Sequence, residues 1–244
     1  MNRRVRVFYS DREELRDDAV SDEELVTVYV NGLKFISIFA LPRHLDKLAV
    51  GFLVSEGVCD YEDIRDVKVD GSAVKVEVSG KDRLELLTEL RSSGCSGIMQ
   101  REPEPLDRDG RFSRKVILKS LDNFSDRELE WSATGGTHAA FLMSAEGKRL
   151  SFFEDVGRHN ALDKVVGWAL QESVALGDKF LLFTGRLSSG IVTKAVRVGI
   201  PLVVSNTAPL SRALILGDKL GVTLAGFARN SKFNVYSNEW RIKD

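Results

Sequence analysis

Cys95 is the residue of this chain best suited to act as a nucleophile. It lies in the small-residue run Arg91-Ser92-Ser93-Gly94-Cys95-Ser96-Gly97, with glycines on both sides that leave the backbone free. A thiol in such a loop can project into solvent and reach another molecule, as a sulfur nucleophile must. The alternative is an incidental cysteine in a linker. Cys59, beside a predicted helix end, has no such setting, and we expect it to pack in a core.

A second candidate is the polar junction Glu154-Asp155-Val156-Gly157-Arg158-His159-Asn160-Ala161-Leu162-Asp163-Lys164. A predicted strand over residues 150–153 stops here and an amphipathic helix begins. Ligands of open α/β sheets bind where strand ends meet helix N-termini, so this corner could form a site. The alternative is a capped helix start, with Asn160 or Asp155 as the cap.

Four further polar junctions, residues 133–138, 184–190, 205–209 and 226–232, could bind phosphate or a base edge. Each could also be an ordinary turn or helix cap. Because four of the five junctions follow predicted strands, we expect them to converge on one sheet edge, which favours a binding site. The predicted cofactor-binding residues are Gly135, Gly136, Thr137, His138, Asp155, Arg158, His159, Asn160, Arg186, Ser188, Ser205, Asn206, Phe227, Ala228, Arg229, Asn230, Ser231 and Lys232.

The first part of the chain has the pattern of a small α+β unit. Two apolar pairs, each joined through a turn dipeptide, predict β-hairpins: residues 26–30 with 34–39 around Asn31-Gly32, and 64–69 with 73–78 around Asp70-Gly71. A helical period runs from Leu45 to Leu53, and Gly57 suits its end. We also expect a helix over residues 83–90.

The remainder alternates between helical and extended patterns, which predicts a sheet with parallel strands and covering helices. The flexible run 91–97 is the best boundary, so we expect two domains, residues 1–100 and 101–244. Expected strands are 137–143, 149–153, 180–184, 201–205 and 222–227; expected helices are 115–121, the segment after His159, 189–198 and 211–220.

Composition excludes several classes of partner. The 244 residues include 35 basic and 36 acidic side chains, a net charge of −1 that gives no large field for nucleic acid or an anionic membrane. No apolar run approaches membrane-spanning length and no signal-peptide pattern is seen, so we expect a cytoplasmic protein. Two cysteines make neither a disulfide framework nor a cysteine-rich zinc site, and we expect no metal ligands.

Several stretches together resemble the FdhD/NarQ family of formate dehydrogenase accessory sulfurtransferases. They are residues 133–140, 154–164, 185–189, 226–229 and 234–237. The resemblance implies a C-terminal α/β sandwich like that of cytidine deaminases. It also implies that Cys95 takes persulfide sulfur from a cysteine desulfurase and passes it to the molybdenum or tungsten bis-pterin guanine dinucleotide cofactor of formate dehydrogenase. The protein would bind that cofactor, with GDP as a fragment analogue, and would form a homodimer.

The chain departs from the family pattern at two places. The family loop carries two cysteines, whereas here Ser92 stands at the first position and only Cys95 remains. Gly190 stands where the family commonly has glutamate. Zinc deamination is rejected, because Ala161 replaces the deaminase glutamate and the helix start at Ser188 has no cysteine. A guanine-nucleotide or molybdopterin-cofactor chaperone without sulfur chemistry remains the alternative function.

Overall fold

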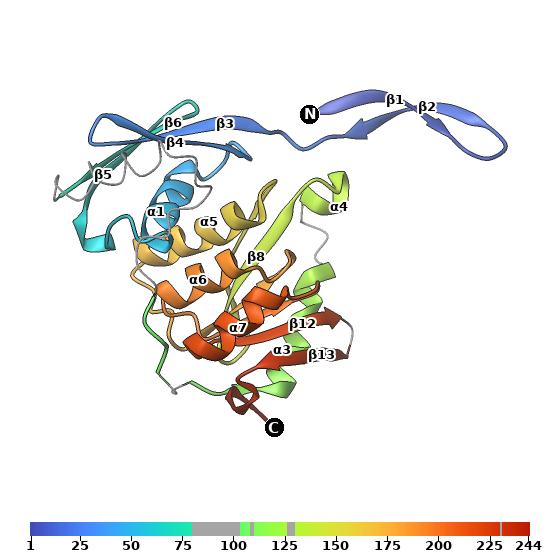
Figure 1. Ribbon diagram of the computed structural model, residues 1–244. Helices are drawn as coiled ribbons and strands as arrows, with labels where there is room; N and C mark the ends of the chain where they lie inside the picture. The colour runs from blue at the N-terminus through green and yellow to red at the C-terminus, as the bar shows by residue number, and fades with distance from the viewer. Residues whose placement is uncertain (80–102, 108–109, 126–129, 230) are drawn as a thin grey trace.

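The protein has a mixed α/β fold with two main sheets (Figure 1). The computed structural model describes residues 1–79, 103–107, 110–125, 130–229 and 231–244. Cys95, Ser92, Asn230, the expected helix over residues 83–90 and the expected boundary at 91–97 lie outside the described residues.

The N-terminal sheet has the strand order β4-β3-β6-β5. Its strands β3 (Glu24–Val30), β4 (Leu33–Ala40), β5 (Ile64–Asp70) and β6 (Ala73–Val78) form the two predicted hairpins. Asn31 and Gly32 both have positive φ, 50° and 79°, as the tight turn requires. The helix α1 (Leu45–Ser55) covers one face, and Cys59, 5% exposed, packs in the core between them as predicted.

The second sheet has the order β13-β12-β11-β10-β8-β9. The predicted strands are confirmed as β8 (His138–Ser144), β9 (Arg149–Asp155), β10 (Lys179–Phe183), β11 (Leu202–Ser205) and β12 (Thr223–Arg229). The strand β13 (Lys232–Ser237), which pairs with β12 in antiparallel fashion, was not predicted from the sequence. The strands β10, β11 and β12 are parallel, whereas β8 runs against β9 and β10.

Helices cover both faces of the six-stranded sheet. Buried side chains of α5 (Arg158–Gln171), α6 (Ser189–Arg197) and α7 (Ser211–Leu220) form one core, and those of α3 (Arg114–Ser120) form the other. These helices confirm the predicted alternation. The remaining described elements of the body are η1 (Tyr61–Asp63), β7 (Phe112–Ser113), η2 (Leu121–Ser125), α4 (Glu130–Thr134), η3 (Glu239–Arg241) and β14 (Ile242–Lys243).

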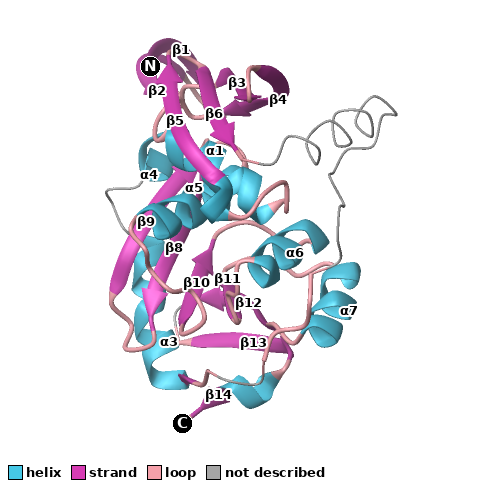
Figure 2. Cartoon of the chain, turned by 90° about the vertical axis from the view of Figure 1, so that its left-hand side faces the viewer, coloured by secondary structure: helices cyan, strands magenta, loops and turns pink. Residues whose placement is uncertain are grey.

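The helix α1 lies between the four-stranded sheet and α5 (Figure 2). Two glycines allow the helix backbones to touch: a Cβ on Gly51 would lie 1.8 Å from the carbonyl oxygen of Asp163, and one on Gly167 2.0 Å from that of Lys47. Beside this contact, Lys194 Nζ of α6 donates to both oxygens of Asp163 at 2.8 and 2.9 Å. The N-terminal unit is therefore joined to the second sheet by a tight backbone contact and by Ser55 and Glu56, which bind the buried Lys194–Asp163 pair.

An N-terminal hairpin, not predicted from the sequence, extends away from the body (Figure 1). It consists of β1 (Asn2–Phe8) and β2 (Glu13–Ala19), paired in antiparallel register from Asn2 opposite Ala19 to Phe8 opposite Glu13. Among the described residues, no helix is both long and apolar enough to cross a membrane.

Candidate functional site

The five polar junctions meet at one edge of the six-stranded sheet. Because β9, β10, β11 and β12 run in the same direction, their carboxyl ends lie together, and β8, which runs against them, begins at that edge. A pocket of about 340 Å³ opens there, within the size range of small-ligand sites. It is lined by Phe124, Trp131, Gly135, Gly136, Thr137, His138, Ala139, Val156, Thr184, Asn206 and Thr207.

Glu154 fixes one wall of this pocket. Its carboxylate accepts the backbone N–H of Glu130 at 2.7 Å and of Trp131 at 3.0 Å, at the start of α4, and the Thr137 hydroxyl at 2.6 Å. A carboxylate at a helix start satisfies amides that have no partner within the helix. Glu154 is therefore a positioning residue that holds the Trp131 helix and the glycine turn against each other.

Trp131 lines the pocket and is 54% exposed, so a ligand bound there could contact its large apolar side chain. Six lining residues were not predicted from the sequence: Phe124, Trp131, Ala139, Val156, Thr184 and Thr207. An available signal was a tryptophan just before the Gly135-Gly136 pair, since indoles stack on planar ligands. Thr184 and Thr207 stood inside the junctions but looked like turn residues.

Asp155 and Asn160 belong to a buried network rather than to the pocket lining. Asp155 is fully buried, and its Oδ2 lies 2.7 Å from Lys164 Nζ. Its Oδ1 accepts the side-chain amide of Asn160 and the backbone N–H of Gly157, each at 2.9 Å. The network reaches the end of β4, because Asn160 donates to the Phe39 carbonyl at 2.9 Å. The alternative of Asn160 or Asp155 as the helix cap is wrong: Gly157 occupies the N-cap position of α5.

Two histidines beside the edge have lowered pKa values. Burial and the nearby Arg158 and Arg186 charges lower the pKa of His138, which lines the pocket. Burial, then the Arg158 and Lys194 charges, lowers the pKa of His159 to about 4. Both imidazoles are therefore neutral near pH 7, and each can donate one hydrogen bond and accept another.

Replacing His159 with glutamine should remove a pH-dependent loss of stability. Between pH 6.5 and about 4 the unfolded chain binds a proton at this position that the folded protein does not, so stability falls as the pH falls. A pKa shift of that size corresponds to a loss of at most about 3 kcal/mol in the free energy of unfolding. Urea unfolding of wild type and His159→Gln near pH 7 and at about pH 4.5 should show the wild type losing more.

Comparing wild type with His159→Gln isolates the contribution of His159 to the pH dependence of stability. Asp163, whose pKa is raised by burial to about 6, has the opposite effect on stability over the same range, but both proteins retain it. Equal pH dependence of the two unfolding free energies would contradict the assignment of a neutral His159.

Ser188 lies at the N-cap of α6, yet its hydroxyl makes no capping bond and lies 3.5 Å from His159 Nε2. A Cβ on Gly190 would lie 3.1 Å from the same nitrogen, so a larger side chain there would crowd His159. Arg158 is half-buried with its Nε atom lacking a hydrogen-bond partner, whereas Arg186 is exposed. The structure thus groups Arg158, His159 and Ser188 beside the pocket, not in its lining.

The polar side chains of the junction after β11 have two different roles. Ser205 is fully buried and holds the turn, donating to the Gly185 carbonyl at 2.8 Å and accepting the Thr207 N–H at 3.0 Å. Asn206 lines the pocket, and its Oδ1 is buried without a hydrogen-bond partner. A buried acceptor without a partner costs free energy, so a donor on a ligand would be favourable here.

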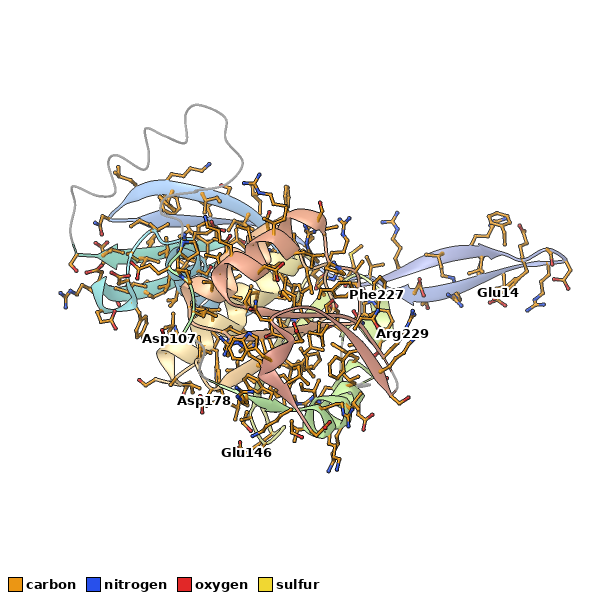
Figure 3. All side chains as sticks on the ribbon, turned by 60° about the horizontal axis from the view of Figure 1, so that its bottom comes forward. Glu14, Asp107, Glu146, Asp178, Phe227 and Arg229 are labelled. Atoms are coloured by element: carbon orange, nitrogen blue, oxygen red, sulfur yellow. The ribbon has the colours of Figure 1, made fainter. Side chains whose placement is uncertain are left out.

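The last junction borders the site without lining the pocket. Phe227 has a φ of 51°, in the left-handed region, and its N–H donates to the Thr207 carbonyl at 3.0 Å. Ala228 is fully buried in the core under α3, which leaves its side chain no access to a ligand. Arg229 and Lys232 are exposed and opposite each other in the β12–β13 register, Ser231 is exposed, and Figure 3 shows Phe227 and Arg229 close together.

No group of three or more histidine, cysteine or carboxylate side chains that could hold a metal ion occurs within the described part of the chain.

Comparison with known proteins places the chain among relatives of similar length. Residues 21–243 match the FdhD/NarQ family. The chain is 37% identical over 244 residues to the "Sulfur carrier protein FdhD" of Shouchella clausii, covering 93% of this chain and 91% of the relative. It is 33% identical over 247 residues to the protein of the same name from Methanothermobacter thermautotrophicus, covering 98% of both chains.

A solved structure shares the whole fold. It is the crystal structure of a protein from Desulfotalea psychrophila described as a candidate formate dehydrogenase accessory protein. The TM-score is 0.83 with 26% sequence identity, over 100% of this chain and 99% of that one.

Proposed function

The chain belongs to the FdhD/NarQ family, and from this premise we propose that it is a sulfur carrier acting in the maturation of formate dehydrogenase. The observation that carries the proposal is similarity over more than nine-tenths of the chain to proteins named sulfur carriers. The family match includes both sheets and the polar edge, so it extends far beyond one motif.

In the proposed mechanism Cys95 carries the sulfur. Its thiolate attacks the outer sulfur of a cysteine persulfide on a desulfurase. The donor's S–S bond breaks, its cysteine leaves as a thiolate, and a new S–S bond forms on Cys95. Electrons balance without an external oxidant, because one disulfide-type bond replaces another. A single cysteine suffices for this exchange, and Ser92 at the family's other cysteine position takes no part.

The pocket at the sheet edge is the proposed binding place for the cargo, a molybdenum or tungsten bis-pterin guanine dinucleotide. Trp131 offers a face for a planar ring, and the unpartnered Asn206 Oδ1 offers an acceptor for a ring N–H or amino group. Arg158 and Arg186, close enough to affect the pKa of His138, would attract phosphate. The residues present therefore fit a purine nucleotide.

Replacing Trp131 with alanine should weaken GDP binding by roughly tenfold or more, because stacking of a base on an aromatic side chain contributes about 1–3 kcal/mol. Isothermal titration of the full chain with GDP measures this. The matched control is Phe39→Ala, which removes an aromatic ring that is 59% exposed on the other sheet. ADP and inorganic phosphate are the comparison ligands. Equal affinity for GDP and ADP would contradict guanine recognition. Unchanged GDP affinity in Trp131→Ala would show that the base does not stack on this side chain.

The sulfur-carrier role is tested by incubating the protein with a cysteine desulfurase and cysteine, followed by intact-protein and peptide mass spectrometry. We expect a gain of one sulfur atom on the peptide that contains Cys95, removed by a thiol reductant. GDP binding without any sulfur uptake would instead support a nucleotide- or cofactor-binding chaperone.

A further inference from the structure

The short helix α4 carries Trp131 into the wall of the pocket. It spans only Glu130–Thr134, and none of its residues is buried. A single isolated turn of helix is unstable in water, so contacts with other elements hold α4 in place. Glu154 of β9 supplies one of them, because its carboxylate accepts the first two amide N–H groups of the helix. The position of Trp131 therefore depends on the polar contacts that α4 makes.

Ser21, in the connection between β2 and β3, holds the C-terminal end of α4. The Thr134 hydroxyl donates its one proton to the Glu130 carbonyl at 2.9 Å. The Thr134 oxygen therefore accepts the Ser21 hydroxyl at 2.7 Å, and it also accepts the Gly136 N–H at 3.1 Å. A Cβ on Gly136 would lie 2.6 Å from Ser21 Oγ, so the serine packs directly on the glycine turn that lines the pocket. One hydroxyl thus links the root of the N-terminal hairpin to α4 and to that turn (Figure 1).

Arg43, in the connection between β4 and α1, holds the opposite end of α4. Its Nη2 lies 2.8 Å from Glu130 Oε2, and the Glu130 side chain is only 15% exposed. A partly shielded ion pair loses less of its strength to water and salt than a pair of two exposed side chains does. Neither Arg43 nor Ser21 lines the pocket, and every lining residue in the described part of the chain lies between positions 124 and 207.

We infer that Ser21 and Arg43 are positioning residues for ligand binding. The N-terminal unit holds α4 at both ends through them, and so fixes Trp131 in the place where it meets the base of the nucleotide. The inference rests on the proposed function, because its ligand is the guanine nucleotide proposed for this pocket. A protein whose binding-competent arrangement is only partly populated binds its ligand more weakly in proportion. Loss of either contact lowers that population before any ligand arrives.

Two measurements on the full chain test the inference with Ser21→Ala, Arg43→Gln and the double variant. Isothermal titration should show GDP binding weakened about three- to tenfold by each single change and at least about tenfold by both. Fluorine NMR of ligand-free protein labelled with 5-fluorotryptophan should show the Trp131 signal, assigned by its loss in Trp131→Phe, shifted or broadened. The signals of Trp168 and Trp240 should stay unchanged, and so should the midpoint of thermal unfolding, because α4 buries no residue.

The matched controls remove similar contacts from elements that do not hold α4. Ser37→Ala removes the hydroxyl pair of 3.0 Å that Ser37 makes with Thr27 on the N-terminal sheet. Arg114→Gln removes an ion pair of 2.7 Å with Asp244, and the Arg114 side chain is 55% exposed, close to the 58% of Arg43. Both controls should keep the GDP affinity and the Trp131 signal of wild type.

The inference is overturned if the double variant has the Trp131 signal of wild type, or if its GDP binding weakens no more than that of the controls. Failure of the proposed function has a different signature, which is a wild-type protein that binds no GDP. In that case an altered Trp131 signal in the double variant still supports the positioning of α4 by Ser21 and Arg43, and an unaltered signal still overturns it.

Discussion

A Cys95→Ala protein should take up no sulfur from a desulfurase and should fail to activate formate dehydrogenase in cells that lack the native protein. The reason is chemical: a methyl group cannot form the S–S bond of a persulfide, and the other cysteine cannot substitute. Cys59 is 5% exposed within the core under the N-terminal sheet, where a large donor protein cannot reach its sulfur. Loss of loading should be complete rather than partial.

Two variants accompany this measurement. Cys59→Ala should load sulfur as wild type does, at a modest cost in stability from the lost packing. Ser92→Cys restores the second family cysteine, and we expect little change in loading. Thermal unfolding of each protein shows whether the fold is retained. Activation of formate dehydrogenase by a folded Cys95→Ala protein would contradict the persulfide mechanism.

The sequence predicted most of the body because its local signals are strong. Asn31-Gly32 and Asp70-Gly71 determined two hairpins, and both lie in the structure as expected. The alternation after residue 112 gave the strands and helices of the second sheet, although β8 runs against its neighbours. Strand direction depends on tertiary pairing, which a local pattern does not contain.

The N-terminal hairpin could not be predicted by the same reasoning. Its β2 reads Glu-Glu-Leu-Arg-Asp-Asp-Ala, a run of charges that resembles a solvated segment. The ion pairs that link it to β1, such as Arg6 with Glu13, appear only when the register is known. A charged strand of this kind therefore carries no apolar alternation from which it could be predicted.

At the candidate site, sequence located the polar junctions but not the roles of their members. Asp155 stood beside Arg158 in a run rich in possible ligands, yet it is fully buried against Lys164. Lys164 was the last residue of the same run, and no role was predicted for it. Whether a polar side chain faces a pocket or another buried group depends on elements that meet only in the folded chain, here α5 and the end of β4.

Replacing Gly51 or Gly167 with alanine should destabilise the protein by at least about 3 kcal/mol, although alanine is the better helix former by about 1 kcal/mol. The new methyl carbon would lie 1.8 Å from a backbone oxygen at Gly51 and 2.0 Å at Gly167. Backbone atoms of a packed helix cannot rotate away as a flexible side chain would, so α1 and α5 must separate by more than about 1 Å.

Separation of the helices would also disturb the ion pair beside them. Ser55 of α1 donates to Asp163 at 2.7 Å, and Lys194 donates to Ser55 at 2.9 Å as well as to Asp163. Asp163 and Lys194, on α5 and α6, would stay paired but would each lose the buried hydrogen bond with Ser55, and a buried polar group left without a partner costs about 1–3 kcal/mol. The steric and electrostatic costs therefore act in the same direction, and together they exceed the gain in helix propensity.

Urea unfolding of Gly51→Ala, Gly167→Ala and Gly177→Ala would measure these effects. Gly177 is the matched control, because its Cβ would meet nothing within 4 Å, and its unfolding free energy should stay within about 0.5 kcal/mol of wild type. A wild-type unfolding free energy in Gly51→Ala would mean that α1 does not rest on α5.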